Sequence, residues 1–174
     1  MWLCGTEMTG RTLGILGFGR VGFGVARRMK PFGLKRILYN DLYPTTMADD
    51  MGVDYVDFQT LIKESDFLVI SCGLNGASMG LFNSDVFKKM KNSAILINTS
   101  RGQIVNTDDI TQALKDGEIE AAGLDVSDPE PLPQDHPLVS MDNCVILPHL
   151  GTNSKETRLN MALDAARNII STLK

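Results

Sequence analysis

The chain has 174 residues, about the length of one domain, since domains usually run to ~100–200 residues. Hydrophobic residues make up 43% and charged residues 22%, an ordinary globular composition that argues against a disordered, collagenous or coiled-coil protein. The net charge is −4, whereas a nucleic-acid-binding protein normally carries a basic excess that neutralises phosphates. We therefore expect no nucleic-acid partner.

In chain order, the expected elements are a strand over 12–16, a helix over 21–30, a strand over 36–39, a helix over 45–51, a strand over 53–55, a helix over 58–64, a strand over 67–71, a helix over 85–90, a strand over 94–98, a helix that ends at Gly117, strands over 121–125 and 144–147, and a helix over 154–173. Asp57 and Ser84 are expected to cap the third and fourth helices, and Asn106 or Thr107 the fifth.

Strands that alternate with helices predict right-handed βαβ units and a parallel sheet. The strands are apolar with little alternation, as expected where helices cover both faces. The sequence therefore predicts one doubly wound α/β domain of the Rossmann type over residues 1–174. Ligands of such sheets bind at the carboxyl ends of the strands. The proline-rich segment 127–141 is too long for a simple connector, which is typical of a functional loop.

The cysteines and the apolar runs indicate a cytoplasmic protein. Cys4, Cys72 and Cys144 lie far apart and form no CxxC pair, so neither a disulfide framework nor a metal site is expected. The first ten residues lack the basic and long apolar stretches of a secretory signal. The apolar runs are too short to span a bilayer, so we expect no membrane partner.

Gly17, Gly19 and Gly22 fit the pattern G-x-G-x-x-G between the first expected strand and helix, the context that a dinucleotide-binding turn requires. The first glycine permits a tight bend, the second lets a pyrophosphate approach the backbone, and the third lets the helix pack close to the sheet. The helix N-terminus offers unpaired N–H groups to the phosphates. A glycine-rich turn without a ligand is the alternative.

Asp41 lies just past the second expected strand, 19 residues after Gly22. An acid in this position accepts hydrogen bonds from the ribose hydroxyls of the adenosine half and repels a 2′-phosphate. Leu42 and Tyr43 follow it, so no neighbouring cation would receive that phosphate. This pattern favours NAD over NADP. The adjacent Asn40 leaves the assignment open by one position, and a solvated loop aspartate is the alternative.

The segments after the fifth, sixth and seventh strands contain Arg101, Glu130 and His149. Reduction of a 2-keto acid by a nicotinamide needs these three kinds of group. A cation orients the substrate carboxylate and polarises the ketone, and an imidazole protonates the developing alkoxide. A carboxylate beside the imidazole fixes its tautomer and stabilises its charged form. We expect the three to converge at one edge, and His136 to have only a packing role.

Several stretches resemble a known family: WLCG near the start, RTLGILGFGRVG, SDFLVISC, INTSRGQIVN, AAGLDVSDPEPLP and NCVILPHLGT. They resemble the cofactor domain of the D-isomer-specific 2-hydroxyacid dehydrogenases and, within that family, the glyoxylate/hydroxypyruvate reductases. The resemblance implies Arg101, Glu130 and His149 as catalytic residues and Asp125 as the contact of the nicotinamide carboxamide. It also implies hydride transfer to glyoxylate or hydroxypyruvate, and a homodimer formed through this domain. The expected cofactor-binding residues are Gly17, Gly19, Arg20, Val21, Gly22, Asp41, Ser78, Thr99, Asp125 and Gly151.

Two features depart from the family. Where the resemblance implies a threonine–proline pair after the fourth strand, segment 73–80 reads GLNGASMG. We expect Ser78 to keep a ribose contact and the loop to lose the rigidity that proline gives. The family also has a substrate domain, which we expect to lie outside this chain. The isolated chain is therefore expected to bind cofactor but to be only weakly active.

Two other interpretations stay open on the sequence alone. NAD-sensing corepressors share the fold and similar Arg, Glu and His residues, and act as binding proteins rather than enzymes. An S-adenosylmethionine-dependent methyltransferase can share a glycine-rich first turn, but it would leave Arg101, Glu130 and His149 without a role.

Overall fold

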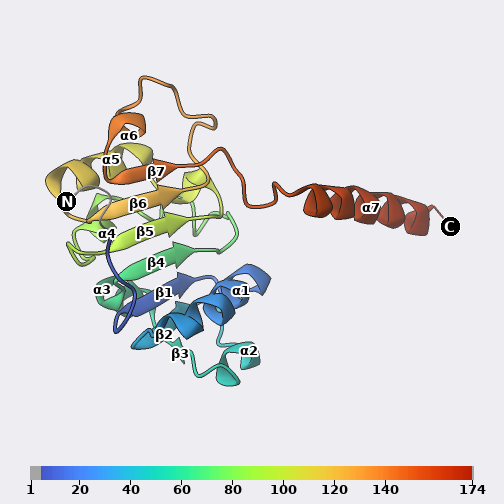
Figure 1. Cartoon of the computed structure of the whole chain (residues 1–174), viewed down its shortest axis with the longest axis horizontal. Helices are drawn as coiled ribbons and strands as arrows, with labels where there is room; N and C mark the ends of the chain where they lie inside the picture. The colour runs from blue at the N-terminus through green and yellow to red at the C-terminus, as the bar shows by residue number, and fades with distance from the viewer. Residues whose placement is uncertain (1–4, 174) are drawn as a thin grey trace.

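A single parallel sheet forms the centre of the protein (Figure 1). The computed structural model describes residues 5–173, so Cys4 and most of the WLCG stretch lie outside the described residues. The seven strands have the order β3-β2-β1-β4-β5-β6-β7. They are β1 (Thr12–Leu16), β2 (Arg36–Asn40), β3 (Asp54–Tyr55), β4 (Phe67–Ile70), β5 (Ile95–Asn98), β6 (Ala121–Leu124) and β7 (Cys144–Ile146). This order confirms the predicted doubly wound α/β fold of the Rossmann type.

Helices flank the sheet on both faces, except the C-terminal helix, which projects away from it (Figure 1). They are α1 (Arg20–Met29), α2 (Thr46–Asp49), α3 (Phe58–Glu64), α4 (Ser84–Phe87), α5 (Thr107–Asp116), α6 (Pro137–Ser140) and α7 (Lys155–Thr172), with 3₁₀ turns η1 (Lys30–Phe32) and η2 (Gly102–Ile104). Leu13 and Ile15 of β1 pack in one core cluster with Ala26 of α1. Leu16 packs in the other cluster with Leu61 of α3. Successive strand residues thus enter opposite cores, which explains why the strands are apolar on both faces.

The helix caps follow the sequence prediction except at α4. Asp57 caps α3 by accepting from the Thr60 N–H at 2.9 Å, and Asn106 caps α5. The prediction that Ser84 caps α4 is wrong. The Asn83 side chain caps this helix instead, and Ser84 is its first residue. Asparagine and serine are similarly favoured as N-caps, so residue type does not show which of these two neighbours caps the helix.

The proline-rich segment 127–141 contains only the short helix α6. His136 caps it, because its ring Nδ1 accepts from the Leu138 N–H at 3.3 Å. His136 therefore has the structural role that the sequence suggests.

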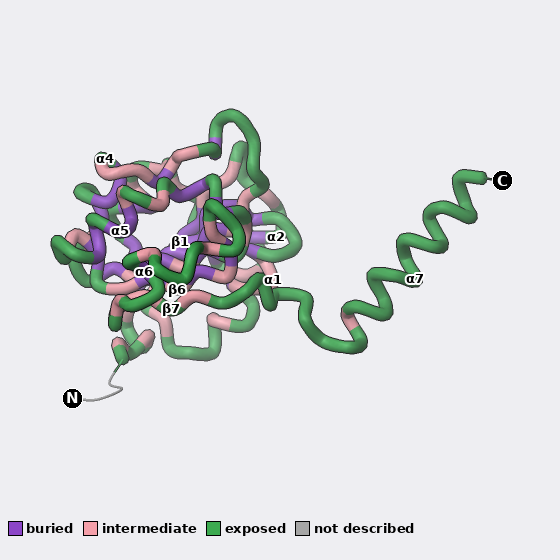
Figure 2. The backbone as a smooth tube through the Cα atoms, turned by 90° about the horizontal axis from the view of Figure 1, so that it is seen from above, coloured by how far each residue is buried: buried purple, intermediate pink, exposed green. Residues whose placement is uncertain are grey.

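Helix α7 lies apart from the rest of the protein (Figures 1 and 2). None of its residues is buried, although Leu159, Leu163 and Ile170 repeat at helical spacing along one side. Within residues 5–173, no helix is both long and apolar enough to cross a membrane.

A polar anchor joins β1, β4 and β5 at the amino ends of the strands. Asp66 accepts from the Thr12 N–H at 2.8 Å and from the Lys91 ammonium, also at 2.8 Å. Burial raises the pKa of the Asp66 carboxyl, but the hydrogen bonds from Lys91 and Thr12 lower it by more, so the net pKa is below its ordinary value.

We expect Asp66→Ala to lower the free energy of unfolding by about 1–3 kcal/mol at pH 7, because Thr12 and Lys91 lose their acceptor. The folded-state pKa of Asp66 is depressed, so its contribution is present at neutral pH and is lost as the pH falls through that folded-state pKa. Urea unfolding at pH 7 and pH 3 should therefore show a difference between wild type and variant that shrinks in acid.

The control is Asp54→Ala. Asp54 lies 3.9 Å from Arg36 and its side chain is 63% exposed, so its loss should cost at most ~1 kcal/mol. Equal losses for the two variants would contradict the role given to Asp66.

Candidate dinucleotide and acid–base site

The glycine-rich turn between β1 and α1 is packed tightly on one side and open on the other. Gly17 has a φ of +88°, in the region that favours glycine, and a Cβ on it would lie 2.5 Å from the Cys72 backbone nitrogen. A Cβ on Gly22 would lie 2.1 Å from the Gly17 carbonyl oxygen. Beside Gly19, a Cβ would meet no protein atom within 4 Å. The first and third glycines are thus needed for packing, and the second leaves space beside the backbone.

Asp41 faces this turn directly. The Phe18 N–H donates to its Oδ2 at 2.7 Å, and the Leu42 N–H donates to its Oδ1 at 2.7 Å. Asn40 instead donates through its side chain to the Val56 carbonyl at 2.8 Å. The acid beside the glycines is therefore Asp41 rather than its neighbour. Each carboxylate oxygen keeps a lone pair with which to accept from another donor.

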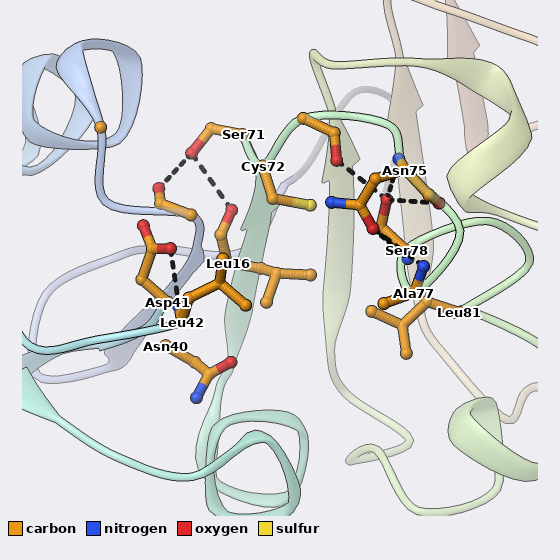
Figure 3. Close-up of a pocket in the computed structure, with 13 residues that line it drawn as sticks. Leu16, Asn40, Asp41, Leu42, Ser71, Cys72, Asn75, Ala77, Ser78 and Leu81 are labelled. Carbon is orange, nitrogen blue, oxygen red and sulfur yellow. Dashed lines mark hydrogen bonds between the residues drawn. The ribbon is translucent and has the colours of Figure 1, made fainter.

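A cavity of about 340 Å³ lies between the glycine-rich turn and the segment that follows β4 (Figure 3). Its lining combines the turn, the end of β2 and the end of β4 with the following segment, as Leu16, Gly17, Gly19, Asn40, Asp41, Leu42, Ser71, Cys72, Gly73, Asn75, Ala77, Ser78 and Leu81. Three strand ends therefore contribute to one cavity, as a parallel sheet requires.

Ser78 does not have the free hydroxyl expected of a ribose contact. It is 7% exposed, and its hydroxyl donates to the Gly73 carbonyl at 2.8 Å and accepts from the Asn75 N–H at 2.8 Å. The hydroxyl proton is thus used within the segment. These bonds also brace the segment, so it is not simply a loop that has lost the rigidity of proline.

The cavity fits the adenosine and pyrophosphate part of a dinucleotide. Gly19 is the N-cap of α1 and has no side chain to occupy the N–H groups of the first helical turn. Those N–H groups and the positive end of the helix dipole favour phosphate. Asp41 supplies acceptors for ribose hydroxyls on the opposite side of the turn.

Asp125, directly after β6, holds the segment that follows β7. Its carbonyl accepts from the His149 N–H at 2.9 Å, and its carboxylate accepts from the N–H groups of Leu150 (2.6 Å) and Gly151 (3.0 Å). His149 has a φ of +55°, which costs a non-glycine residue roughly 1–2 kcal/mol. The three hydrogen bonds offset this strain and fix the position from which the imidazole projects.

The imidazole of His149 contacts a carboxylate. Its Nδ1 lies 2.7 Å from Oε1 of Glu130, so the predicted contact between these two side chains is present. The side chains of His149 and Glu130 are 48% and 42% exposed, which leaves them open to a substrate. With Nδ1 donating to the carboxylate, Nε2 remains for a reacting group.

Arg101 follows β5 at the same edge of the sheet. The buried Asn98 fixes its turn, because Asn98 accepts from the Ser100 N–H at 3.0 Å and donates to the Arg101 carbonyl at 2.9 Å. The exposed guanidinium donates to the Ser100 carbonyl at 2.7 Å. Across residues 5–173 it forms no ion pair, so the structure does not join Arg101 to the Glu130–His149 pair.

A second cavity, of about 630 Å³, lies beside Glu130 and is lined largely by apolar side chains such as Leu132, Val139 and Ile146. Glu130 lines this cavity, whereas Arg101 and His149 do not.

Five predicted cofactor-binding residues line neither cavity: Arg20, Val21, Gly22, Thr99 and Gly151. Thr99 donates through its hydroxyl to the Ile70 carbonyl at 3.2 Å. Arg20 and Val21 line a separate hollow along α1. Their backbone N–H groups nevertheless belong to the first turn of this helix.

Two asparagines that hold segments of the site in place were not predicted from the sequence. Asn98 orients the turn of Arg101, and Asn75 braces the segment after β4. Asn75 precedes Ser78 by three residues, which is the spacing of a helix-capping pair and is the signal that points to it. Asn98 carries no such local signal.

The sheet order, the glycine-rich turn and the acid at the end of β2 define a dinucleotide-binding domain of the Rossmann type. The family profile described as D-isomer specific 2-hydroxyacid dehydrogenase, NAD binding domain, matches residues 1–151. The chain belongs to this NAD-binding family.

Relatives with named activities agree with this assignment. The glyoxylate reductase/hydroxypyruvate reductase of Mus musculus is 49% identical, over 100% of this chain and 53% of the mouse protein. The glyoxylate reductase of Korarchaeum cryptofilum is 41% identical, over 98% of this chain and 52% of that protein. The chain thus spans about half the length of the curated relatives that it matches.

Solved structures show the same fold. An NAD-complexed D-isomer specific 2-hydroxyacid dehydrogenase from Lactobacillus delbrueckii ssp. bulgaricus matches 98% of this chain and 55% of its own length, with 28% identity and a TM-score of 0.89. The apo D-lactate dehydrogenase of Escherichia coli matches 98% of this chain and 54% of its own, with 32% identity and a TM-score of 0.90.

We expect Gly19→Ala and Gly22→Ala to fail in different ways. Gly19 has an ordinary φ of −77° and open space around it, so Gly19→Ala should fold with an unchanged melting temperature but bind NADH at least about tenfold more weakly, which corresponds to ~1.4 kcal/mol. Gly22→Ala places a methyl group against the Gly17 carbonyl and should lower the melting temperature. Thermal unfolding and NADH fluorescence titration measure both effects. Unimpaired NADH binding by a folded Gly19→Ala variant would contradict the position given to the pyrophosphate.

Proposed function

We propose that the chain is the cofactor-binding part of an oxidoreductase that transfers a hydride between a nicotinamide nucleotide and a small 2-keto or 2-hydroxy acid of the glyoxylate or hydroxypyruvate type. The observation that carries the proposal is the 2.7 Å contact between Glu130 and His149. A supported imidazole is the proton donor that reduction of a ketone needs. The names of the mouse and human relatives support the substrate class. In this proposal, residues 1–174 form one dinucleotide-binding unit, and the substrate domain lies outside them.

The proposed roles follow from position. The bound nicotinamide would supply the hydride as NADH and accept it as NAD⁺. His149 Nε2 gives a proton to the developing alkoxide in reduction and takes the hydroxyl proton in oxidation, while Glu130 holds the ring through Nδ1. Arg101 orients the substrate carboxylate and polarises its carbonyl group. Asp125 keeps His149 in place. The family resemblance further implies that Asp125 would contact the nicotinamide carboxamide.

The comparisons give no support to a corepressor, whose function would rest on partner binding alone. We also propose a homodimer formed through this domain, and a cytoplasmic location. Large apolar side chains exposed along β7 and α7, including Val145 and Ile170, support an association surface. Sedimentation velocity of the purified chain tests the oligomeric state.

We expect NADH to bind more tightly than NADPH by roughly tenfold or more, since an unpaired charge clash is typically worth about 1–3 kcal/mol. Asp41 lines the cavity, and the exposed Leu42 and Tyr43 offer no cation to a 2′-phosphate. Fluorescence titration with the two nucleotides measures the ratio. The substitution Asp41→Ser should bring the Kd values for NADH and NADPH closer together. Equal or tighter binding of NADPH to wild type would exclude this role for Asp41.

We expect the isolated chain to bind NADH but to reduce glyoxylate far more slowly than the ~10 s⁻¹ typical of enzymes, because a misplaced substrate alone can cost ~10²-fold. A chimera in which this chain replaces the matching part of the mouse relative should regain turnover. In that chimera, His149→Ala should lower kcat by about 10²–10⁴-fold and leave the Kd for NADH unchanged.

The matched control is His136→Ala, because the chain has 2 histidines and the ring of His136 caps α6. Comparable losses of kcat in both variants would contradict a proton-transfer role specific to His149. A His149→Ala chimera with undiminished turnover would remove it altogether.

A further inference from the structure

The segment that follows β4 forms the wall of the dinucleotide cavity across from Asp41 (Figure 3). Its members in the lining are Ser71, Cys72, Gly73, Asn75, Ala77, Ser78 and Leu81. Of these, Ser71, Cys72, Asn75 and Ser78 have side chains that can donate a hydrogen bond. Any side-chain hydrogen bond from this wall to a nucleotide must therefore come from one of the four.

Asn75 and Ser78 cap each other. Oδ1 of Asn75 accepts from the Ala77 N–H at 2.8 Å and from the Ser78 N–H at 3.1 Å. The Ser78 hydroxyl in turn accepts from the Asn75 N–H at 2.8 Å. These reciprocal bonds are those of a capping box, with Asn75 as the N-cap and Ser78 three residues later. They fix the rotamers of both side chains.

The capping bonds decide how the Asn75 amide is oriented. The oxygen must face the two N–H groups, so Nδ2 must point the other way. Figure 3 shows this nitrogen turned away from the capped turn, toward the gap that Cys72 borders. Among the hydrogen bonds of residues 5–173, none has Asn75 Nδ2 as its donor.

The other hydroxyls on this side of the cavity are already used as donors. Ser78 gives its proton to the Gly73 carbonyl at 2.8 Å, and Ser71 gives its proton to the Gly17 carbonyl at 2.6 Å. The thiol of Cys72 is a weak donor. Asn75 Nδ2 is thus the strong side-chain donor of this wall that remains available to a ligand.

We propose that Asn75 is a nucleotide-binding residue whose Nδ2 donates a hydrogen bond to the adenosine half of the dinucleotide, in the place that the sequence assigns to Ser78. The inference rests on the proposed function, because it takes this cavity to be the cofactor site. The adenosine half offers matching acceptors in its ring nitrogens, ribose oxygens and phosphate. It lies on this side because Asp41, the ribose acid, faces the same cavity.

The test is Asn75→Thr, which keeps a capping oxygen and removes the amide donor. We expect the Kd for NADH to rise about 3- to 10-fold, the loss of one hydrogen bond, and the Kd for ADP to rise by a similar factor. The melting temperature should stay unchanged. NADH fluorescence titration, ADP calorimetry and thermal unfolding provide the three readouts on the complete chain.

Asn83→Thr is the matched control. Asn83 caps α4 with the same pattern of bonds, to the N–H groups of Asp85 and Val86, but it does not line the cavity. It should leave both Kd values unchanged. A similar weakening in the two variants would overturn the inference.

A second variant separates a lost donor from a loosened turn. Gly76 is the first residue after the cap, a position that suits proline, and across residues 5–173 its N–H donates no backbone hydrogen bond. Adding Gly76→Pro to Asn75→Thr should rigidify the turn without restoring affinity. Restored affinity would show that Asn75 acts only through the turn and would overturn the proposed contact.

The remaining outcomes are distinct from one another. If wild type binds NADH and Asn75→Thr binds it equally well, the role of Asn75 fails while the proposed function stands. If Asn75→Thr raises the Kd for NADH but not the Kd for ADP, the contact does not lie in the adenosine half and the inference fails. If wild type binds neither nucleotide, the proposed function itself fails.

Discussion

Seven strands that run in one direction place all of their carboxyl ends at a single edge of the sheet, and the rest of the site depends on this constraint. Residues far apart in sequence meet there because each lies just after its own strand: Asp41 after β2, Asp125 after β6, His149 after β7. The strands themselves need only be apolar on both faces and in register. The loops at this edge can then carry the polar groups without exposing the core.

The loops at this edge must still be held in place. Two carboxylates, those of Asp41 and Asp125, do so by accepting hydrogen bonds from backbone N–H groups. Asp41 accepts backbone N–H groups from Phe18 and Leu42, and Asp125 accepts them from Leu150 and Gly151. Each carboxylate thereby ties together two segments that follow different strands. Since the same residues face the proposed ligand, the groups that would bind it are already oriented before it arrives, which lowers the entropy lost on binding.

The catalytic residues proposed for the site are not all in contact with one another in the structure. Glu130 and His149 are in contact, whereas the guanidinium of Arg101 folds back on the Ser100 carbonyl. Helix α7 buries none of its residues, although most of the stability of helices in proteins comes from the packing of one face against other elements. Solved relatives of about twice the length match 98% of this chain.

The sequence by itself determined the fold class, the strand positions and the glycine-rich turn, because apolar strands, turn glycines and helix caps act over a few neighbouring residues. It also placed Glu130 and His149 together, since both follow strands whose ends share an edge. Only the tertiary structure showed that Asn83, rather than the predicted Ser84, caps α4, and that the Ser78 hydroxyl is consumed within its own turn. It alone also showed that Asn98 orients Arg101. These outcomes depend on which donor meets which acceptor once the chain is folded, and a linear pattern does not contain those distances.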